Sequence, residues 1–244
     1  MATLTHTYLT SSTFVPTASI TSASVQVWGA GGHGNTGGSG GSGGAFASCS
    51  INFVSGSTYT ILVGQATSSN GGLSNITSAS VVLVQAPGGN SDGTITSNGY
   101  ASYLTGSFFT ASGGTGGARA TGSGQVNGGG GGSSAGTAAV GVAGSSSLLS
   151  GASFSQAGMN PNVSNTTSSL YASPEGAPAG ATAPTGGGSG GNGAYYLAQT
   201  DAALLPAQSG SFPGGGGGGN DLISFNRGVD NSAAGANGQV TITY

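Results

Sequence analysis

The chain has 244 residues, of which 53 are glycine and only 3% are charged, against usual shares of about 7% and about 25%. Its two basic residues, Arg119 and Arg227, and its formal net charge of -3 exclude the cationic surfaces that bind nucleic acid or anionic membranes. Disorder is not expected either, because it requires low hydropathy together with high net charge.

The N-terminal segment has neither a basic stretch nor a long apolar run, so no Sec-type signal peptide is recognisable. No apolar run approaches the roughly 20 residues of a membrane span, and we expect no membrane insertion. A virion or extracellular location is expected, since virion proteins are released by lysis; export by a dedicated secretion system is the alternative. Cys49 is the only cysteine, so stability must come without an intrachain disulfide.

Short β-strands are predicted in the first third of the chain. Phe14 and Ile20 suggest a short first strand and a turn. Apolar and polar residues alternate in Ser24–Trp28 and in Ala45–Phe53, which is the period-2 pattern of a half-buried strand. In the second of these strands, Cys49 falls on the apolar face and is expected to be a small core residue, whereas Phe46 is an exception to the alternation.

Further strands are predicted at Tyr59–Gly64, at Val81–Val84 and at the C-terminal Gln239–Tyr244. The clean alternation in the last of these indicates that it returns to pair with the first strands. No segment of useful length has the apolar spacing of a helix. The predicted fold class is therefore all-β, with almost no α-helix: a β-sandwich is formed by the N-terminal strands and the C-terminal strand.

Glycine is concentrated in tracts, the first of which, residues 29–44, holds ten glycines and places them with a period of three on two faces. Polyproline-II-type helices have three residues per turn and no internal hydrogen bonds, so glycine tracts of this kind can approach closely and bond laterally. Flexible linkers are the alternative. The later tracts are Gly113–Gly117, Gly128–Gly132, Gly186–Gly193 and Gly214–Gly219.

We accordingly expect the fold to contain an inserted polyglycine-II helix bundle. Residues 1–87 and 236–244 are assigned to the sandwich frame, and residues 88–235 to the glycine-rich insertion with variable loops, the whole forming one cooperative unit. A dense array of backbone hydrogen bonds between tracts is required, because ordering so much glycine is costly in backbone entropy.

The segment Val25–Gly32, the strand and turn that follow its glycine tract, and the closing Gly238–Tyr244 resemble the frame of the glycine-rich domains in phage tail-fibre and bacterial surface proteins. The resemblance implies a β-sandwich with a polyglycine-II bundle, as in the tail-fibre tip adhesins of T-even phages. In those adhesins, variable loops at the end of the bundle contact the host receptor.

No catalytic or metal-binding pattern is found, so no enzymatic activity and no cofactor or metal are expected. His6 and His33 have no Cys, His or carboxylate neighbours at ligand spacing. The five acidic residues are scattered, whereas general acid–base catalysis needs paired groups. The letters G-x-S-x-G at Gly40–Gly44 lie within a period-three tract and not between a strand and a helix.

The predicted function is that of a structural subunit of a phage tail fibre or extracellular filament, acting by self-association. The alternative is a receptor-binding adhesin that uses loops at 90–112, 145–185 and 194–213 to bind a host surface glycan or outer-membrane protein. Aromatic residues in the inserts are candidate receptor or subunit contacts, with packing in the core or at subunit interfaces as the alternative. They are Tyr100, Tyr103, Phe108, Phe109, Tyr195 and Tyr196.

Overall fold

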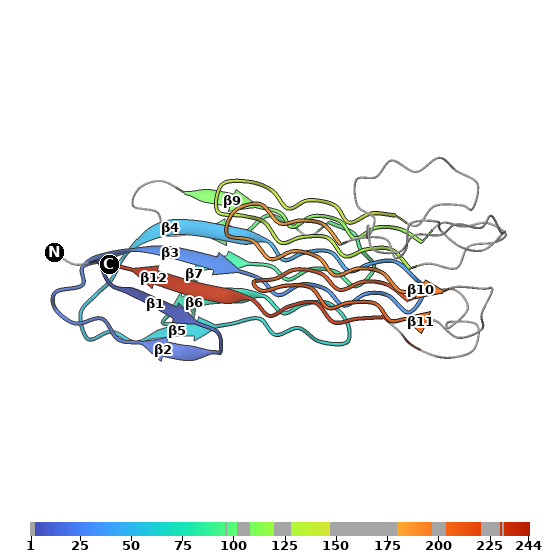
Figure 1. Cartoon of the computed structure of the whole chain (residues 1–244). Helices are drawn as coiled ribbons and strands as arrows, with labels where there is room; N and C mark the ends of the chain where they lie inside the picture. Colours follow the sequence, from blue (N-terminus) through green and yellow to red (C-terminus); the bar gives the residue numbers. More distant parts are fainter. Residues whose placement is uncertain are drawn as a thin grey trace.

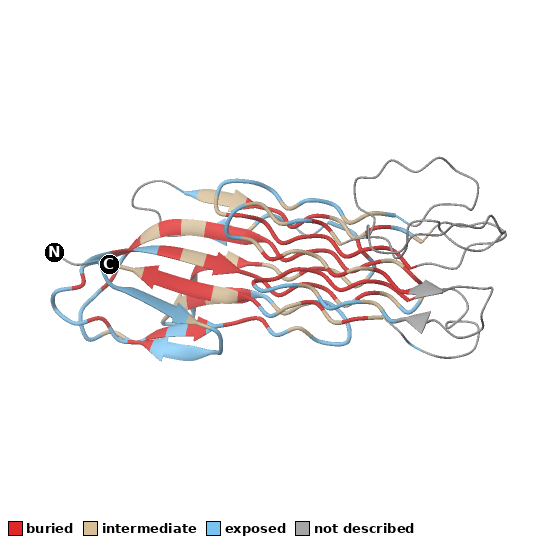
Figure 2. Cartoon of the chain, in the orientation of Figure 1, coloured by how far each residue is buried: buried red, intermediate tan, exposed pale blue. Residues whose placement is uncertain are grey.

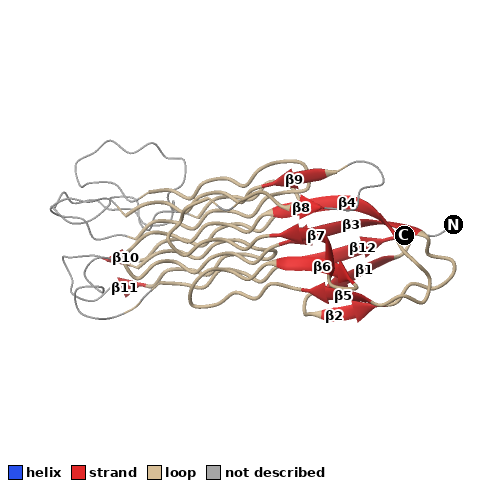
Figure 3. Cartoon of the chain, turned by 180° about the vertical axis from the view of Figure 1, so that it is seen from behind, coloured by secondary structure: helices blue, strands red, loops and turns tan. Residues whose placement is uncertain are grey.

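The computed structural model describes residues 3–95, 97–101, 108–119, 128–146, 180–196, 204–220, 230 and 232–244. Within these ranges the chain forms strands and extended segments and no helix, as predicted. A β-sandwich occupies one end of the molecule, and a bundle of long extended segments leads away from it (Figures 1 and 3). No helix long and apolar enough to cross a membrane occurs among the described residues.

One five-stranded sheet combines the two ends of the chain, and all its neighbours are antiparallel. The C-terminal strand lies between two N-terminal strands, with Val240 opposite Val27, which confirms the predicted return of the chain. In order across the sheet, the strands are β1 (Thr5–Tyr8), β12 (Gln239–Thr243), β3 (Ser22–Trp28), β4 (Phe46–Asn52) and β9 (Phe109–Ala111).

The second sheet is also five-stranded and antiparallel. Its β6–β7 hairpin turns through Ala79 and Ser80, whose φ angles of 46° and 67° are those of a tight primed turn. In order, its strands are β2 (Ser12–Phe14), β5 (Tyr59–Leu62), β6 (Ser74–Ser78), β7 (Val81–Ala86) and β8 (Tyr100–Ala101).

The main hydrophobic core lies between the two sheets. Alternate residues of β3 and β4 point into it, including Val25, Val27 and Cys49, and they pack with Ile61 and Ile76 of the second sheet. The predicted inward face of β4 is therefore confirmed, and Cys49 is a buried core residue with 3% of its surface exposed. Figure 2 shows that burial continues from the sandwich into the middle of the bundle.

Phe46 departs from the alternation because it belongs to a second, smaller core on the outer face of the first sheet. It stacks at a tilt on Trp28, with ring centroids 4.7 Å apart. Ala111 and Ala135 complete this cluster, and Phe109 packs against it. A bundle segment thus covers the outer face of the sheet, so that sandwich and bundle share a core.

A third, two-stranded sheet lies at the other end of the molecule. It pairs β10 (Tyr195–Tyr196) with β11 (Leu204–Leu205) in antiparallel fashion. These strands lie at the end of the bundle remote from the sandwich, whereas both chain ends lie at the sandwich (Figure 1). We call the end that carries β10 and β11 the distal end.

Candidate functional site

The bundle consists of extended segments whose backbone amides point to different neighbours with a period of three. In the segment 29–35, every third amide donates to the same neighbouring segment, which confirms the threefold repeat of polyglycine II. Residues 29, 32 and 35 donate to carbonyls of the segment 39–45, residues 30 and 33 to 69–72, and residues 31 and 34 to 233–236, at 2.7–3.0 Å.

The hexaglycine Gly214–Gly219 lies at the centre of the bundle, because six segments surround it. Its amides and the following Asn220 amide donate chiefly to three segments, and its carbonyls accept from three others. The segments receiving its hydrogen bonds are 208–211, 129–132 and 32–35, and those donating to it are 191–194, 41–44 and 233–236. All six glycines are buried.

Close approach of backbones explains why these six residues are all glycine. A Cβ added to Gly216 would lie 2.2 Å from the carbonyl oxygen of Gly41, and one on Gly217 would lie 1.9 Å from that of Ala233. Neither contact can be relieved by rotating a side chain, because the obstructing atoms belong to the backbone. A central segment with six neighbours therefore has room for no side chain.

Segments away from the centre carry side chains on the third face of the screw. In residues 38–44, Gly40 and Gly43 face one neighbour and Gly41 and Gly44 another, each without room for a Cβ. Ser42 occupies the remaining face, and its hydroxyl accepts a hydrogen bond from the Asn90 amide at 2.7 Å. The two glycine faces predicted from the spacing are thereby confirmed.

The segments run outward and back between the sandwich and the distal end. Strands β10 and β11, which border one of the longer breaks in the described chain, lie at the distal end (Figure 1). Beside β10, the Gly128 amide donates to the Ala194 carbonyl, the Ala194 amide to the Gly219 carbonyl and the Gly180 amide to the Asn192 side chain, so segments that border three further breaks end there too. Two of the three predicted insert loops, 145–185 and 194–213, are thus joined to the bundle at the end opposite the chain ends, whereas the third, 90–112, contains the sandwich strands β8 and β9. Most of the residues of those loops lie outside the described part of the chain.

The candidate contact aromatics fall into two groups. Tyr100 in β8 and Phe108 beside β9 belong to the sandwich and are exposed. Phe109 is half-buried and packs on Phe46, with ring centroids 5.9 Å apart. Tyr195 and Tyr196 form β10 at the distal end, and Tyr103 lies outside the described residues.

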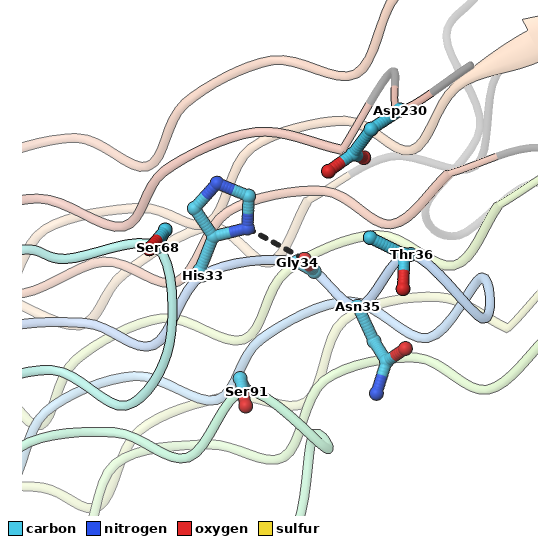
Figure 4. Close-up of a pocket in the computed structure, with 7 residues that line it drawn as sticks. All are labelled: His33, Gly34, Asn35, Thr36, Ser68, Ser91 and Asp230. Atoms are coloured by element: carbon cyan, nitrogen blue, oxygen red, sulfur yellow. Dashed lines mark hydrogen bonds between the residues drawn. The ribbon is translucent and has the colours of Figure 1, made fainter. Parts of the chain in front are cut away.

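A polar hollow of about 180 Å³ lies in the bundle, lined by residues from four separate segments. Within it, the Nδ1–H of His33 donates to the carbonyl oxygen of Gly34 at 2.6 Å. The imidazole of His33 and the carboxylate of Asp230 lie on the same side of the segment that carries Gly34 (Figure 4). The lining residues are His33, Gly34, Asn35, Thr36, Ser68, Ser91 and Asp230.

This hollow was not predicted from the sequence, where His33 and Asp230 have no informative neighbours. Two of its walls are turns: the Ser91 amide donates to the Asn70 side-chain oxygen at 2.8 Å, and the His33 amide donates to the Ser69 carbonyl at 2.9 Å. The chain that carries His33 itself turns back at residues 35–39, where the Asn35 amide donates to the Ser39 carbonyl at 2.7 Å. The hollow lies where these turns come together.

Titratable groups in the described ranges are few, and no three His, Cys, Asp or Glu residues there gather at metal-binding distance. The pKa of Asp92 is lowered, chiefly because its carboxylate accepts hydrogen bonds from the Thr94 hydroxyl and amide. Burial raises the pKa of Tyr8, with a smaller contribution from Tyr244, and burial raises that of Cys49 to about 11.

The threefold screw, the buried polyglycine core and the flanking sandwich are features of a glycine-rich domain. A family model described as a glycine-rich domain matches residues 5–244, which is nearly the whole chain. The chain therefore belongs to this family of glycine-rich domains. No curated protein has a sequence that matches it significantly.

Proposed function

We propose that the chain is a non-enzymatic adhesin-type structural protein of a phage tail fibre or another extracellular assembly, which presents loops at the distal end to a cell surface. The observation that carries this proposal is the polarity of the molecule. Both chain ends lie at the sandwich, and the insert loops 145–185 and 194–213 join the bundle at the opposite end (Figure 1). A structure that holds the sandwich therefore directs the loops outward.

The bundle suits this role because it is a stiff support. Its segments are linked in several directions by backbone hydrogen bonds of 2.7–3.3 Å, and its central glycines leave no space for rearrangement. A rigid scaffold positions binding loops without an ordering cost at the moment of contact. Most of the described residues that flank these loops lie on this scaffold. The loop sequences can therefore change without altering the packed interior of the bundle.

The test compares the intact chain with a variant in which residues 147–179, which join Ser146 to Gly180, are replaced by a short glycine–serine linker. Fluorescent conjugates of both proteins are incubated with a panel of bacterial strains, and bound protein is measured by flow cytometry. The proposal predicts that some strains bind the intact chain and that the variant loses this binding while retaining its melting temperature. Equal binding by the two proteins, or no strain that binds, would contradict it.

Self-association into a filament is the second candidate function. It is favoured by the edges of the two larger sheets, where β1, β2, β8 and β9 each have one neighbouring strand among the described residues and carry no Lys, Arg, Asp or Glu. Charged residues on edge strands normally oppose edge-to-edge pairing, so pairing between copies meets little resistance here.

Electron microscopy and light scattering of the purified chain distinguish the two functions. Regular filaments whose formation is abolished by Thr7→Lys in β1 would support self-association through that edge. Dispersed particles that bind cells would support the adhesin, and dispersed particles without cell binding would count against both.

A further inference from the structure

We propose that the polar hollow around His33 and Asp230 binds a single neutral sugar ring. The inference does not rest on the adhesin proposed above. It rests on the position, chemistry and rigidity of the lining residues, of which Ser91 alone belongs to a predicted insert loop, 90–112.

The lining of the hollow is almost entirely hydrogen-bonding. Because a carbonyl oxygen only accepts, the Nδ1 of His33 must donate to Gly34, which leaves Nε2 as the ring atom available to a ligand. The Oδ1 atom of Asp230 accepts from the Ser232 amide at 2.9 Å and from the Ser232 hydroxyl, which leaves Oδ2 without a hydrogen-bond donor among the described residues. Hydroxyls of Thr36, Ser68 and Ser91 complete the lining.

This chemistry favours a neutral polyhydroxyl ligand over other classes. Among the described residues no Lys or Arg lines the hollow, so this part of the chain offers a phosphate or a carboxylate no cation to offset the charge of Asp230. The described lining residues include no large apolar side chain either, which disfavours a lipid or an aromatic ligand. Sugar hydroxyls both donate and accept, and they match a set consisting of a carboxylate, a ring nitrogen, an amide and several hydroxyls.

The size of the hollow limits the ligand to about one ring. Its volume of about 180 Å³ is below the roughly 300–1,000 Å³ of sites for drug-sized molecules. Since none of the described lining residues is Phe, Tyr or Trp, a dissociation constant of about 1 mM is expected. Such a site becomes effective when several copies engage a glycan-covered surface together.

The hollow is held in shape before any ligand arrives. The Asn70 side chain bridges two hairpins by accepting from the Ser91 amide at 2.8 Å and from its hydroxyl at 3.2 Å. Backbone hydrogen bonds of 2.9 Å from His33 to Ser69 and 2.8 Å from Gly34 to Ala233 fix the remaining walls. Binding therefore requires little reorganisation.

The test is an NMR titration of the ¹⁵N-labelled chain with methyl glycosides of glucose, galactose, mannose and N-acetylglucosamine, with mannitol as an open-chain polyol. We expect saturable shifts of the Gly34, Asn35, Thr36, Ser68 and Ser91 amides with at least one glycoside. Mannitol should produce no saturable change, because only the ring presents its hydroxyls in a fixed arrangement.

Two variants and two matched controls locate the site. His33→Ala and Asp230→Asn are each expected to weaken glycoside binding by about tenfold or more, since each removes a hydrogen bond to the ligand or weakens one. His6→Ala and Asp92→Asn change the same residue types outside the hollow and should leave the affinity unchanged. Asp230 is exposed, so its variant is expected to fold even if that of His33 is not.

Three results would overturn the proposal: no saturable shift with any of the glycosides, shifts confined to residues outside the hollow, or unchanged affinity in Asp230→Asn. Loss of cell binding on replacement of residues 147–179, with glycoside binding retained, would show that the two sites are independent.

Discussion

The indole N–H of Trp28 donates a hydrogen bond of 3.1 Å to the carbonyl oxygen of Ala135. Trp28 is the last residue of β3, and Ala135 lies in the bundle segment that folds over the outer face of the same sheet. The two residues are buried, and the contact joins parts of the chain 107 positions apart. It is one of the places where the sandwich and the bundle become a single packed body.

Removing the indole donor should destabilise both parts together. In Trp28→Phe the Ala135 oxygen keeps only the 3.3 Å hydrogen bond from the Ser134 hydroxyl, and packing on Phe46 is reduced. We expect the free energy of unfolding to fall by about 1–3 kcal/mol, as measured by denaturant titration. Tyr100→Phe, at an exposed position, is the control and should change stability by less than about 0.5 kcal/mol. Separate transitions for sandwich and bundle would contradict this coupling.

A methyl group in the centre of the bundle should be far more damaging than one at its rim. Gly216→Ala would place Cβ 2.2 Å from the Gly41 carbonyl oxygen, and we expect a loss of more than about 4 kcal/mol or failure to fold. At Gly37 the nearest obstacle is the side-chain oxygen of Asn35 at 2.9 Å, which can rotate away at the cost of its hydrogen bond from the Gly37 amide. Gly37→Ala should therefore cost no more than about 1 kcal/mol. Similar melting temperatures for the two variants would contradict the close backbone packing described for the centre of the bundle.

Amide hydrogen exchange should be slowest where the sequence contains no side chains at all. The amides of Gly215–Gly219 all donate to carbonyls of neighbouring segments and are buried, so they should exchange only on global unfolding. Thr5 and Thr7 in the exposed edge strand β1 should exchange faster. NMR-detected exchange of the labelled chain measures both groups. Fast exchange across the hexaglycine would indicate a flexible linker instead of a bundle.

Cys49 is expected to make the free energy of unfolding fall as the pH rises in the alkaline range. Burial raises the pKa of its thiol from 9.0 to about 11, so above pH 9 the unfolded chain loses the proton first and unfolding becomes more favourable. We expect the stability difference between wild type and Cys49→Ala to shrink as pH rises from about 9 to about 11 and to be constant below that range. Thermal melts of the two proteins across this range measure the effect, since tyrosine ionisation is common to both.

The same thiol should be unreactive in the folded chain, because only the thiolate attacks thiol reagents. A chromogenic disulfide reagent at neutral pH should modify Cys49 no faster than the chain unfolds. Rapid modification under native conditions would contradict the buried position between the sheets.

Strands whose inward face is apolar could be predicted from the sequence. Alternation in β3, β4 and β12 identified the faces that meet in the main core, and only their ends shifted by one or two residues. The strands β1 (THTY) and β6 (SNITS) were missed because they are mostly polar. Their strand structure comes from pairing with β12, β5 and β7, which local pattern does not show.

Period-three glycine predicted the bundle, but not which segment lies at its centre. In retrospect the unbroken run Gly214–Gly219 carries that information, because only a segment surrounded on all sides needs glycine at every position. The polar hollow could not be predicted, because the residues that line it, including His33 and Asp230, come from separate segments. Their positions depend on the residue at which each segment turns back, and no local sequence motif specifies that residue.

Neighbouring glycine segments recognise one another through amide and carbonyl groups that every residue possesses. Such a lattice of backbone hydrogen bonds does not specify which segment lies beside which. A glycine tract displaced by one three-residue repeat would form equivalent hydrogen bonds. The correct order must therefore be imposed from outside the lattice, by the strand pairings at one end and by the lengths of the connections at the other. The sandwich, whose strands carry distinctive side chains, therefore serves as the template that aligns glycine segments which are otherwise equivalent to one another.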